Sequence, residues 1–181
     1  TTTTDSHNTA VGYDAGNDIT TGVNNTLVGA EAGDKLSDAD FNVAVGSISL
    51  SADTYGSRST AVGYYALAIQ NSTSATSVGN VGVGYYAGSA ITTGTNNTCI
   101  GRDSGLATNL QTGTGNVLVG TYSHTSAVDS DYANGFGYDI NAVAGYTTVG
   151  SGAEDIRAPH GNIVWAVVSD ERLKKDIEDA T

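Results

Sequence analysis

The chain has 181 residues and a formal net charge of −12, with 19 acidic residues against 7 basic ones. This charge argues against a nucleic-acid partner, because phosphates bind to basic surfaces. One cysteine excludes an internal disulfide framework. A membrane-spanning helix needs an apolar run of about 18 residues, and no run in this sequence approaches that length, so we expect no membrane insertion.

One five-residue motif returns along the chain. It reads Asn-Thr-Ala-Val-Gly at residues 8–12, and each later copy ends at a glycine. Most intervals between these glycines are about 17 residues long, and a short fixed period predicts a solenoid, in which each unit contacts only its neighbours. The interval from Gly63 to Gly84 is the longest. The glycines are Gly12, Gly29, Gly46, Gly63, Gly84, Gly101 and Gly120, with weaker copies ending at Gly137 and Gly150.

Each copy predicts a short β-strand that ends at the glycine. In the first copy, Thr9 and Val11 share one face of the strand and Ala10 points to the other, because side chains alternate. The equivalent residues of later copies are small to medium in size and largely uncharged on both faces. This is typical of a strand buried on both sides, or of one between its own coil and a neighbouring chain.

Two residue types of the motif have predicted backbone roles. The glycine indicates either a turn with positive φ or the close approach of another backbone. The asparagines either stack into a ladder from coil to coil or close the preceding turn on the backbone. They stand at positions 8, 25, 42, 80, 97 and 116.

The coils are thin. With two or three apolar side chains per coil of about 17 residues, we expect that a single chain cannot enclose a core. Lateral cover from other copies is then needed, and three-fold symmetry closes a fibre. The predicted fold is all-β: a repetitive β-solenoid or β-roll-like fibre, assembled as a parallel homotrimer, with a short helix beginning at its C-terminal end.

The repeat has a recognisable relative. The unit Asn-Thr-Ala-Val-Gly-Tyr-x-Ala-Gly, with Thr-Thr-Gly-x-Asn-Asn links, resembles the repeats of phage tail fibres and related fibrous adhesins. It is also similar to the Asn-Ser-x-Ala-Ile-Gly units of trimeric autotransporter adhesin heads, which form trimeric left-handed β-rolls. The resemblance covers roughly residues 8–124 and implies a trimeric β fibre.

After residue 124 the pattern loosens. We expect residues 1–124 to form the repeat fibre and residues 125–168 an irregular β cap or neck. The most apolar strand is expected at residues 162–168, and its unique tryptophan, Trp165, is expected to plug the end of the fibre. Because the chain opens without methionine and stops inside a helical pattern, we interpret it as a fragment of a longer polypeptide.

Residues 169–181 change in style. Charges concentrate, and Leu173 and Ile177 lie four apart on one predicted helical face. The run Ser-Asp-Glu-Arg-Leu-Lys resembles the start of the C-terminal intramolecular chaperone domain of phage endosialidases and tail fibres, here truncated. In that family the serine is the self-cleavage nucleophile and the lysine its base, which implies Ser169 and Lys174. The alternative is that Ser169 is an N-cap and Lys174 a solvated charge.

Other candidate chemistry is sparse. His7, His124 and His160 show no metal-ligand spacing, so no metal or cofactor is expected. Cys99 occupies a slot held elsewhere by alanine or leucine, and we expect it in the core. Tyrosines that follow the repeat glycines are candidate stacking platforms for sugars, with packing against adjacent coils or chains as the alternative. The candidate glycan contacts are Tyr13, Tyr64, Tyr65, Tyr85 and Tyr86.

The predicted function is a structural and adhesive segment of a trimeric viral tail fibre, extracellular on the virion, ending at a maturation junction. Its expected partners are two further copies of itself and a host-surface glycan or protein receptor. No enzyme activity is expected beyond a single self-cleavage at Ser169 in the full-length parent. The alternatives are a bacterial trimeric adhesin head and a tailspike depolymerase acting on surface polysaccharide. Paired carboxylates of a glycoside hydrolase are not evident in the sequence.

Overall fold

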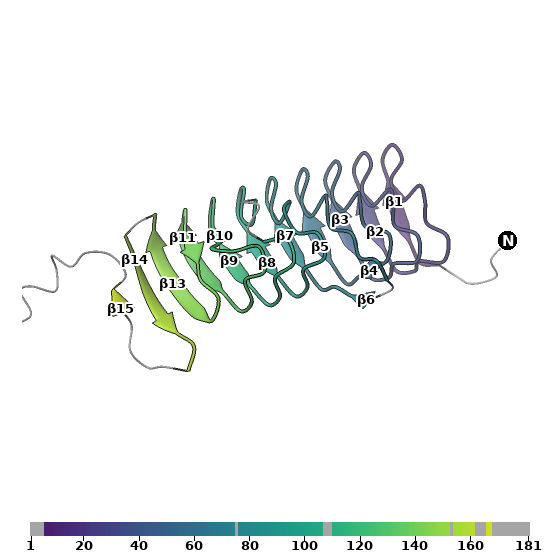
Figure 1. The fold of residues 1–181 in the computed structure, drawn as a ribbon. Helices are drawn as coiled ribbons and strands as arrows, with labels where there is room; N and C mark the ends of the chain where they lie inside the picture. The colour runs from purple at the N-terminus through teal and green to yellow at the C-terminus, as the bar shows by residue number, and fades with distance from the viewer. Residues whose placement is uncertain (1–5, 75, 107–109, 153, 162–165, 168–181) are drawn as a thin grey trace, which may run out of the picture.

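The computed structural model describes residues 6–74, 76–106, 110–152, 154–161 and 166–167. These residues form a β-solenoid of about eight turns, with no helix among them. Successive coils stack along one axis from the N-terminal to the C-terminal end (Figure 1). The predicted all-β solenoid is thereby confirmed. The predicted C-terminal helix, together with Trp165, Ser169 and Lys174, lies outside the described residues.

One sheet of 11 strands runs the length of the solenoid. Its strands are parallel from β1 to β13, and the last two pairs, β13 with β14 and β14 with β15, are antiparallel. The sheet continues from β9 to β11 without interruption. In spatial order the strands are β1 (Thr9–Val11), β2 (Thr26–Val28), β3 (Val43–Val45), β5 (Thr60–Val62), β7 (Val81–Val83), β8 (Thr98–Ile100), β9 (Val117–Val119), β11 (Asn134–Tyr138), β13 (Tyr146–Ser151), β14 (Glu154–Pro159) and β15 (Ala166–Val167).

Two small parallel sheets lie beside the main one. The first pairs β4 (Gly56–Ser57) with β6 (Thr76–Ser77), next to the longest interval of the repeat. The second pairs β10 (His124–Thr125) with β12 (Asn141–Ala142). Both are formed by links between strands of the main sheet.

A single chain encloses its own core. The central residue of a three-residue strand points into the coil, and Leu27, Cys99 and Leu118 are fully buried there. The prediction that one chain cannot enclose a core is therefore wrong. The links supply the missing apolar side chains, which a count of the strands alone overlooks. These buried link residues are Leu36, Leu50, Leu67, Ile91 and Leu110.

The links fill the core in two alternative ways. In some coils a leucine four residues after the repeat glycine enters the core, as Leu50 and Leu67 do. In others that position is a glycine and an apolar residue three places later takes the space, as in the pair Gly33 and Leu36. A Cβ on Gly33 would lie 2.7 Å from Cδ1 of Leu36. Only one of the two arrangements fits in each coil.

The repeat glycines are required for both predicted reasons at once. Gly84 has a φ of +135°, a region that L-residues rarely adopt. A Cβ at this position would also lie 2.6 Å from the carbonyl oxygen of Gly101 in the next coil. The same positive φ, between +125° and +155°, recurs at all nine repeat glycines. They form a column along which the coils approach too closely for a side chain.

The asparagines form a buried ladder, with one side chain per coil. The side-chain oxygen Oδ1 of Asn25 accepts a hydrogen bond from the backbone N–H of Asn42 at 2.9 Å. Its Nδ2 donates to the carbonyl oxygen of Ala39 at 2.7 Å. Both partners belong to the following coil, so the amide ties two coils together. The coil-to-coil alternative is confirmed, although most of these bonds go to backbone rather than to the next amide.

The ladder changes where the repeat is longest. Ser59 stands in the asparagine slot, and the buried side chain of Gln70 bridges the gap. Nε2 of Gln70 donates to Asp53 and, at 3.1 Å, to Oγ of Ser59, while its Oε1 accepts from Nδ2 of Asn80 at 2.9 Å. The buried carboxylate of Asp53 also accepts the backbone N–H of Gly56 at 2.9 Å. Hydrogen bonding therefore continues through the irregular coil.

Candidate binding surfaces

Four of the five candidate tyrosines form one cluster on two adjacent coils. Tyr64 and Tyr65 follow β5, and Tyr85 and Tyr86 follow β7. The rings of Tyr64 and Tyr85 are stacked with centroids 5.5 Å apart, and those of Tyr65 and Tyr86 with centroids 4.7 Å apart. The fifth, Tyr13, follows β1 at the other side of two intervening strands and is 73% exposed.

The stacking decides which parts of the cluster face solvent. Ring faces are turned toward the tyrosine of the adjacent coil, while Tyr64 and Tyr85 remain 41% and 51% exposed. The ring faces inside each stack are thus covered, and a ligand can contact only the remaining surface of the rings and their hydroxyl groups. Burial is the main cause of the raised pKa of Tyr86. For Tyr13 the raised pKa comes first from a hydrogen bond with the side chain of Asp14.

A second exposed aromatic group was not predicted from the sequence. The guanidinium carbon of Arg102 lies 4.6 Å from the ring centroid of Tyr122, and Tyr122 meets Tyr138 edge-on at 6.2 Å. Arg102 also forms an ion pair with Asp103 at 3.0 Å. The hydrogen bond to the Tyr122 hydroxyl is the first cause of the raised pKa of Arg102. Both polar contacts are made by Nη1 of Arg102.

The outer face of the main sheet carries a continuous column of aliphatic and aromatic side chains. Each member pairs in register with the next, from Val11 opposite Val28 to Val149 opposite Ile156. Seven of the ten members are between 36% and 59% exposed. We call this set the outer aliphatic column: Val11, Val28, Val45, Val62, Val83, Ile100, Val119, Phe136, Val149 and Ile156.

The two faces of the repeat strands differ in burial. In the single chain, the face that contains Leu27 is buried and the face that contains Val28 is exposed. From β1 to β13 no charged residue belongs to the column or to the residues beside it on the same strands, such as Thr26 and Val43; the last strand, β14, places Glu154 beside Ile156 on this face. The solvent-facing side of a β-sheet usually carries polar and charged residues. The apolar character of this face is instead typical of an interaction surface.

The other predicted chemical groups are quickly placed. Cys99 is fully buried in the core, as predicted, and burial raises the pKa of its thiol to about 12. Within the ranges that the structure describes, no three His, Cys, Asp or Glu side chains come together as a metal-binding group. His160 lies within 3.3 Å of the Thr147 hydroxyl, a surface contact. Ser169 and Lys174, the candidate self-cleavage pair, lie outside the described residues.

Comparison with known proteins adds no relative. No family model, curated protein or solved structure matches the chain. None of the described residues belongs to a helix with the length and apolar character needed to cross a lipid bilayer. The function of the chain is therefore inferred from its own surfaces.

Proposed function

We propose that this chain is a structural and adhesive segment of a trimeric viral tail fibre. Three parallel copies associate through their outer aliphatic columns, around an axis along the fibre. The observation that carries the proposal is the column itself, ten uncharged side chains in register along the main sheet. The chain encloses its own core, and the column nevertheless remains exposed on the outer face of the sheet. The proposed association therefore does not depend on the expectation that one chain cannot enclose a core.

The size of this face suits a stable interface. Dividing the burial free energy of a valine by about 25 cal/mol per Å² gives its total apolar area. Taking the partly exposed share of that area, each column side chain offers on the order of 50 Å² of accessible surface. With the adjoining threonine and valine positions, the face amounts to on the order of 1,000 Å² per copy, against about 800 Å² per partner in stable complexes. Monomeric soluble proteins rarely leave so long an apolar surface open. A second copy offers the same uncharged face at the same strand spacing.

Light scattering coupled to size exclusion tests the assembly. A trimer has three times the mass of the single 18.3 kDa chain. Val45→Glu and Ile100→Glu place a charge in the column and are expected to reduce the mass to that of one chain. Thr93→Glu, on an exposed link away from the sheet face, is the matched control and keeps the trimer. Circular dichroism verifies that every variant stays folded; a folded wild-type monomer contradicts the proposal.

The adhesive part of the proposal needs its own experiment. A receptor-binding fibre retains a host-surface polysaccharide intact, whereas a depolymerase releases oligosaccharides from it. Incubating the assembled fibre with purified capsule and analysing the supernatant by mass spectrometry distinguishes the two. We expect binding without release, and the appearance of oligosaccharides would favour the enzyme instead.

For the parent polypeptide we retain self-cleavage at Ser169 with Lys174 as base. Support comes from the residue pattern alone, in which a serine stands five residues before a lysine. Mass spectrometry of a parent that contains the downstream residues is expected to give a fragment beginning at residue 169. Ser169→Ala and Lys174→Ala each leave that parent intact, and cleavage that persists in both would refute the assignment.

A further inference from the structure

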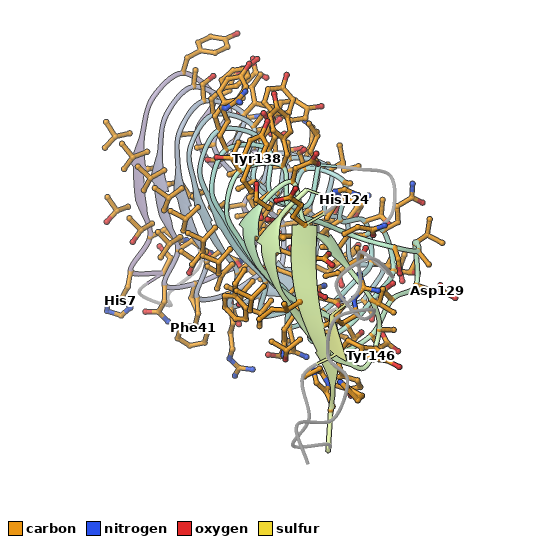
Figure 2. All side chains as sticks on the ribbon, turned by 90° about the vertical axis from the view of Figure 1, so that its left-hand side faces the viewer. His7, Phe41, His124, Asp129, Tyr138 and Tyr146 are labelled. Carbon is orange, nitrogen blue, oxygen red and sulfur yellow. The ribbon has the colours of Figure 1, made fainter. Side chains whose placement is uncertain are left out.

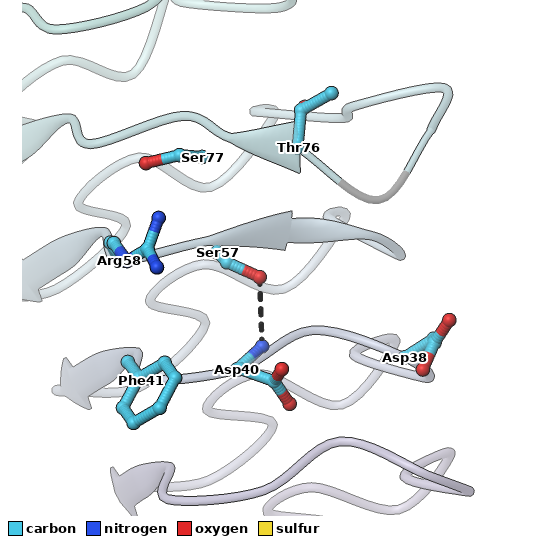
Figure 3. A pocket seen from close by; sticks show the side chains of 7 residues that line it. All are labelled: Asp38, Asp40, Phe41, Ser57, Arg58, Thr76 and Ser77. Carbon is cyan, nitrogen blue, oxygen red and sulfur yellow. Dashed lines mark hydrogen bonds between the residues drawn. The ribbon is translucent and has the colours of Figure 1, made fainter.

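The longest coil of the solenoid bears a pocket that the repeat does not explain. It has a volume of about 300 Å³ and spans three successive coils. The small sheet forms part of its wall, with Ser57 from β4 and Thr76 and Ser77 from β6. Phe41 and Arg58 line its other part, as Figure 3 shows. Pockets that bind small molecules begin at about this volume.

Phe41 and Arg58 occupy a slot that suits neither residue. The slot precedes the ladder position in each coil, and its backbone is left-handed, with φ of +59° at Phe41 and +66° at Arg58. In other coils the slot holds Asn24, Gly79 and Asn96, which adopt this conformation readily, but it also holds the larger His7 and Tyr132. Left-handed backbone also occurs at Leu50 and Leu67 inside the core, so the distinguishing feature of Phe41 and Arg58 is that both are exposed beside the pocket.

The two side chains contact each other and are open to a ligand. The guanidinium carbon of Arg58 lies 5.9 Å from the ring centroid of Phe41, within the range of a cation–π interaction. Phe41 is 51% exposed, and the guanidinium of Arg58 forms no ion pair with any described residue. Among the described residues none accepts a hydrogen bond from this guanidinium, whereas Nη1 of Arg102 donates to the hydroxyl of Tyr122. Figure 2, which looks along the solenoid, shows Phe41 low and Tyr138 high in the view, and Phe41 precedes β3 whereas the clustered tyrosines follow β5 and β7, so this site is separate from the tyrosines.

The acidic residues of the pocket are held in place. Oδ1 of Asp40 accepts the backbone N–H of Val23 at 2.8 Å, and the backbone N–H of Asp40 donates to Oγ of Ser57 at 2.9 Å. Asp38 accepts a hydrogen bond from the hydroxyl of Thr21. The second carboxylate oxygen of each aspartate has no described partner, so the pocket offers fixed acceptors.

We propose that this pocket binds a neutral hexopyranose unit of a saccharide. A sugar hydroxyl both donates and accepts hydrogen bonds, which matches a pocket lined by two carboxylates, one guanidinium and three hydroxyl groups. The ring of Phe41 supplies an apolar surface for the C–H face of the sugar. Two carboxylates against one guanidinium, on a chain of net charge −12, disfavour an anionic ligand. The inference rests on the adhesive part of the proposed function, but the pocket lies within one chain and needs no trimer.

Saturation-transfer NMR with methyl glucoside, galactoside and mannoside tests the proposal, with methyl glucuronide as the anionic probe. Phe41→Asn and Arg58→Asn install the residue that the same slot holds in other coils, so both are expected to fold. Tyr132→Asn, in the same left-handed slot of a coil away from the pocket, is the matched control. Mass measurements on the same samples report the oligomeric state independently.

We expect saturation transfer to at least one neutral glycoside at about 10 mM, the range of weak single-sugar binding. Phe41→Asn and Arg58→Asn should each weaken it about five- to tenfold, and Tyr132→Asn should leave it unchanged. Transfer to the glucuronide alone, transfer to none of the probes, or equal transfer in Phe41→Asn would each overturn the proposal. A monomeric protein that still binds the sugar would refute only the trimer.

Discussion

Replacing Gly84 by alanine tests whether the glycine column sets the spacing of the coils. The added Cβ would meet the carbonyl oxygen of Gly101 at 2.6 Å and its carbonyl carbon at 2.7 Å. Both are backbone atoms, so no side chain can rotate away. The backbone φ of +135° is itself strained for alanine. Two costs therefore act together, a conformational one and a steric one.

The magnitude follows from the contacts around this position. Strain at a sparsely populated backbone conformation costs about 1–3 kcal/mol. Relief of the clash separates the coils and weakens two backbone hydrogen bonds, from Gly101 N–H to Val83 O and from Asp103 N–H to Tyr85 O, both 2.8 Å. Each contributes about 1 kcal/mol, so we expect Gly84→Ala to lower the free energy of unfolding by about 4 kcal/mol.

Gly145→Ala is the matched control. Its φ of +74° is also left-handed, but a Cβ there would meet no atom within 4 Å. We expect it to cost about 1 kcal/mol, the conformational part alone. Urea unfolding gives the overall difference, and hydrogen exchange at the amides of Gly101 and Asp103 locates it, since repeat arrays need not unfold as one unit. Equal costs for the two variants would refute a steric role for the column.

Three further predictions concern buried side chains. Asn97→Ala removes an amide that bonds to the next coil and should destabilise the protein by about 3 kcal/mol, against less than about 1 kcal/mol for the exposed Asn96→Ala, both measured by urea unfolding. Gln70→Ala leaves the buried carboxylate of Asp53 short of a donor and should cost about 2–4 kcal/mol, with a lowered melting temperature by circular dichroism. The thiol of Cys99 should resist a disulfide reagent at pH 8 until the protein unfolds. Because burial raises its pKa to about 12 from 9.0, the unfolded chain releases this proton first. Stability relative to Cys99→Ala should then fall between pH 9 and 12, by about 1.4 kcal/mol per unit, and a constant difference would contradict it.

Features that every coil repeats were predictable from the sequence. The position of each strand, the need for Gly84 and its equivalents, and the stacking of Asn25 and Asn42 are set by local backbone geometry. Each coil presents the same geometry to the next, so one short period carries the information. The predicted coil length of about 17 residues, which the solenoid confirms, follows from the same signal.

The core escaped prediction because its residues do not keep the period. Leu67 enters the core four residues after the repeat glycine, but Leu36 enters seven residues after it. A search for an apolar residue at one fixed position of every repeat therefore identifies neither leucine as part of the pattern. Only the exchange between a leucine and a glycine at the fourth position, as in Leu67 and Gly33, carries the signal.

The candidate sites were predictable only in part. The register of Tyr64 and Tyr85 follows from the repeat, but stacking of their rings depends on the distance between coils. The pocket at Phe41 and Arg58 had a signal that went unused: two successive coils carry a large residue in a slot that holds asparagine or glycine in several other coils. The position of the inserted strand β6 beside them depends on a link of unusual length and has no periodic pattern.

The hydrogen bonds between coils also determine how the solenoid responds to tension. Bonds such as that from Gly84 N–H to Val62 O run from coil to coil, parallel to the solenoid axis, so tension between the ends pulls directly against them. Coils contact only their neighbours and can open one at a time. Each opened coil of about 17 residues lengthens the chain by roughly 55 Å beyond the strand spacing it gives up. Under tension between its ends the solenoid is therefore expected to lengthen in steps of similar size. The longest interval of the repeat, between Gly63 and Gly84, gives one longer step, which marks how far rupture has advanced.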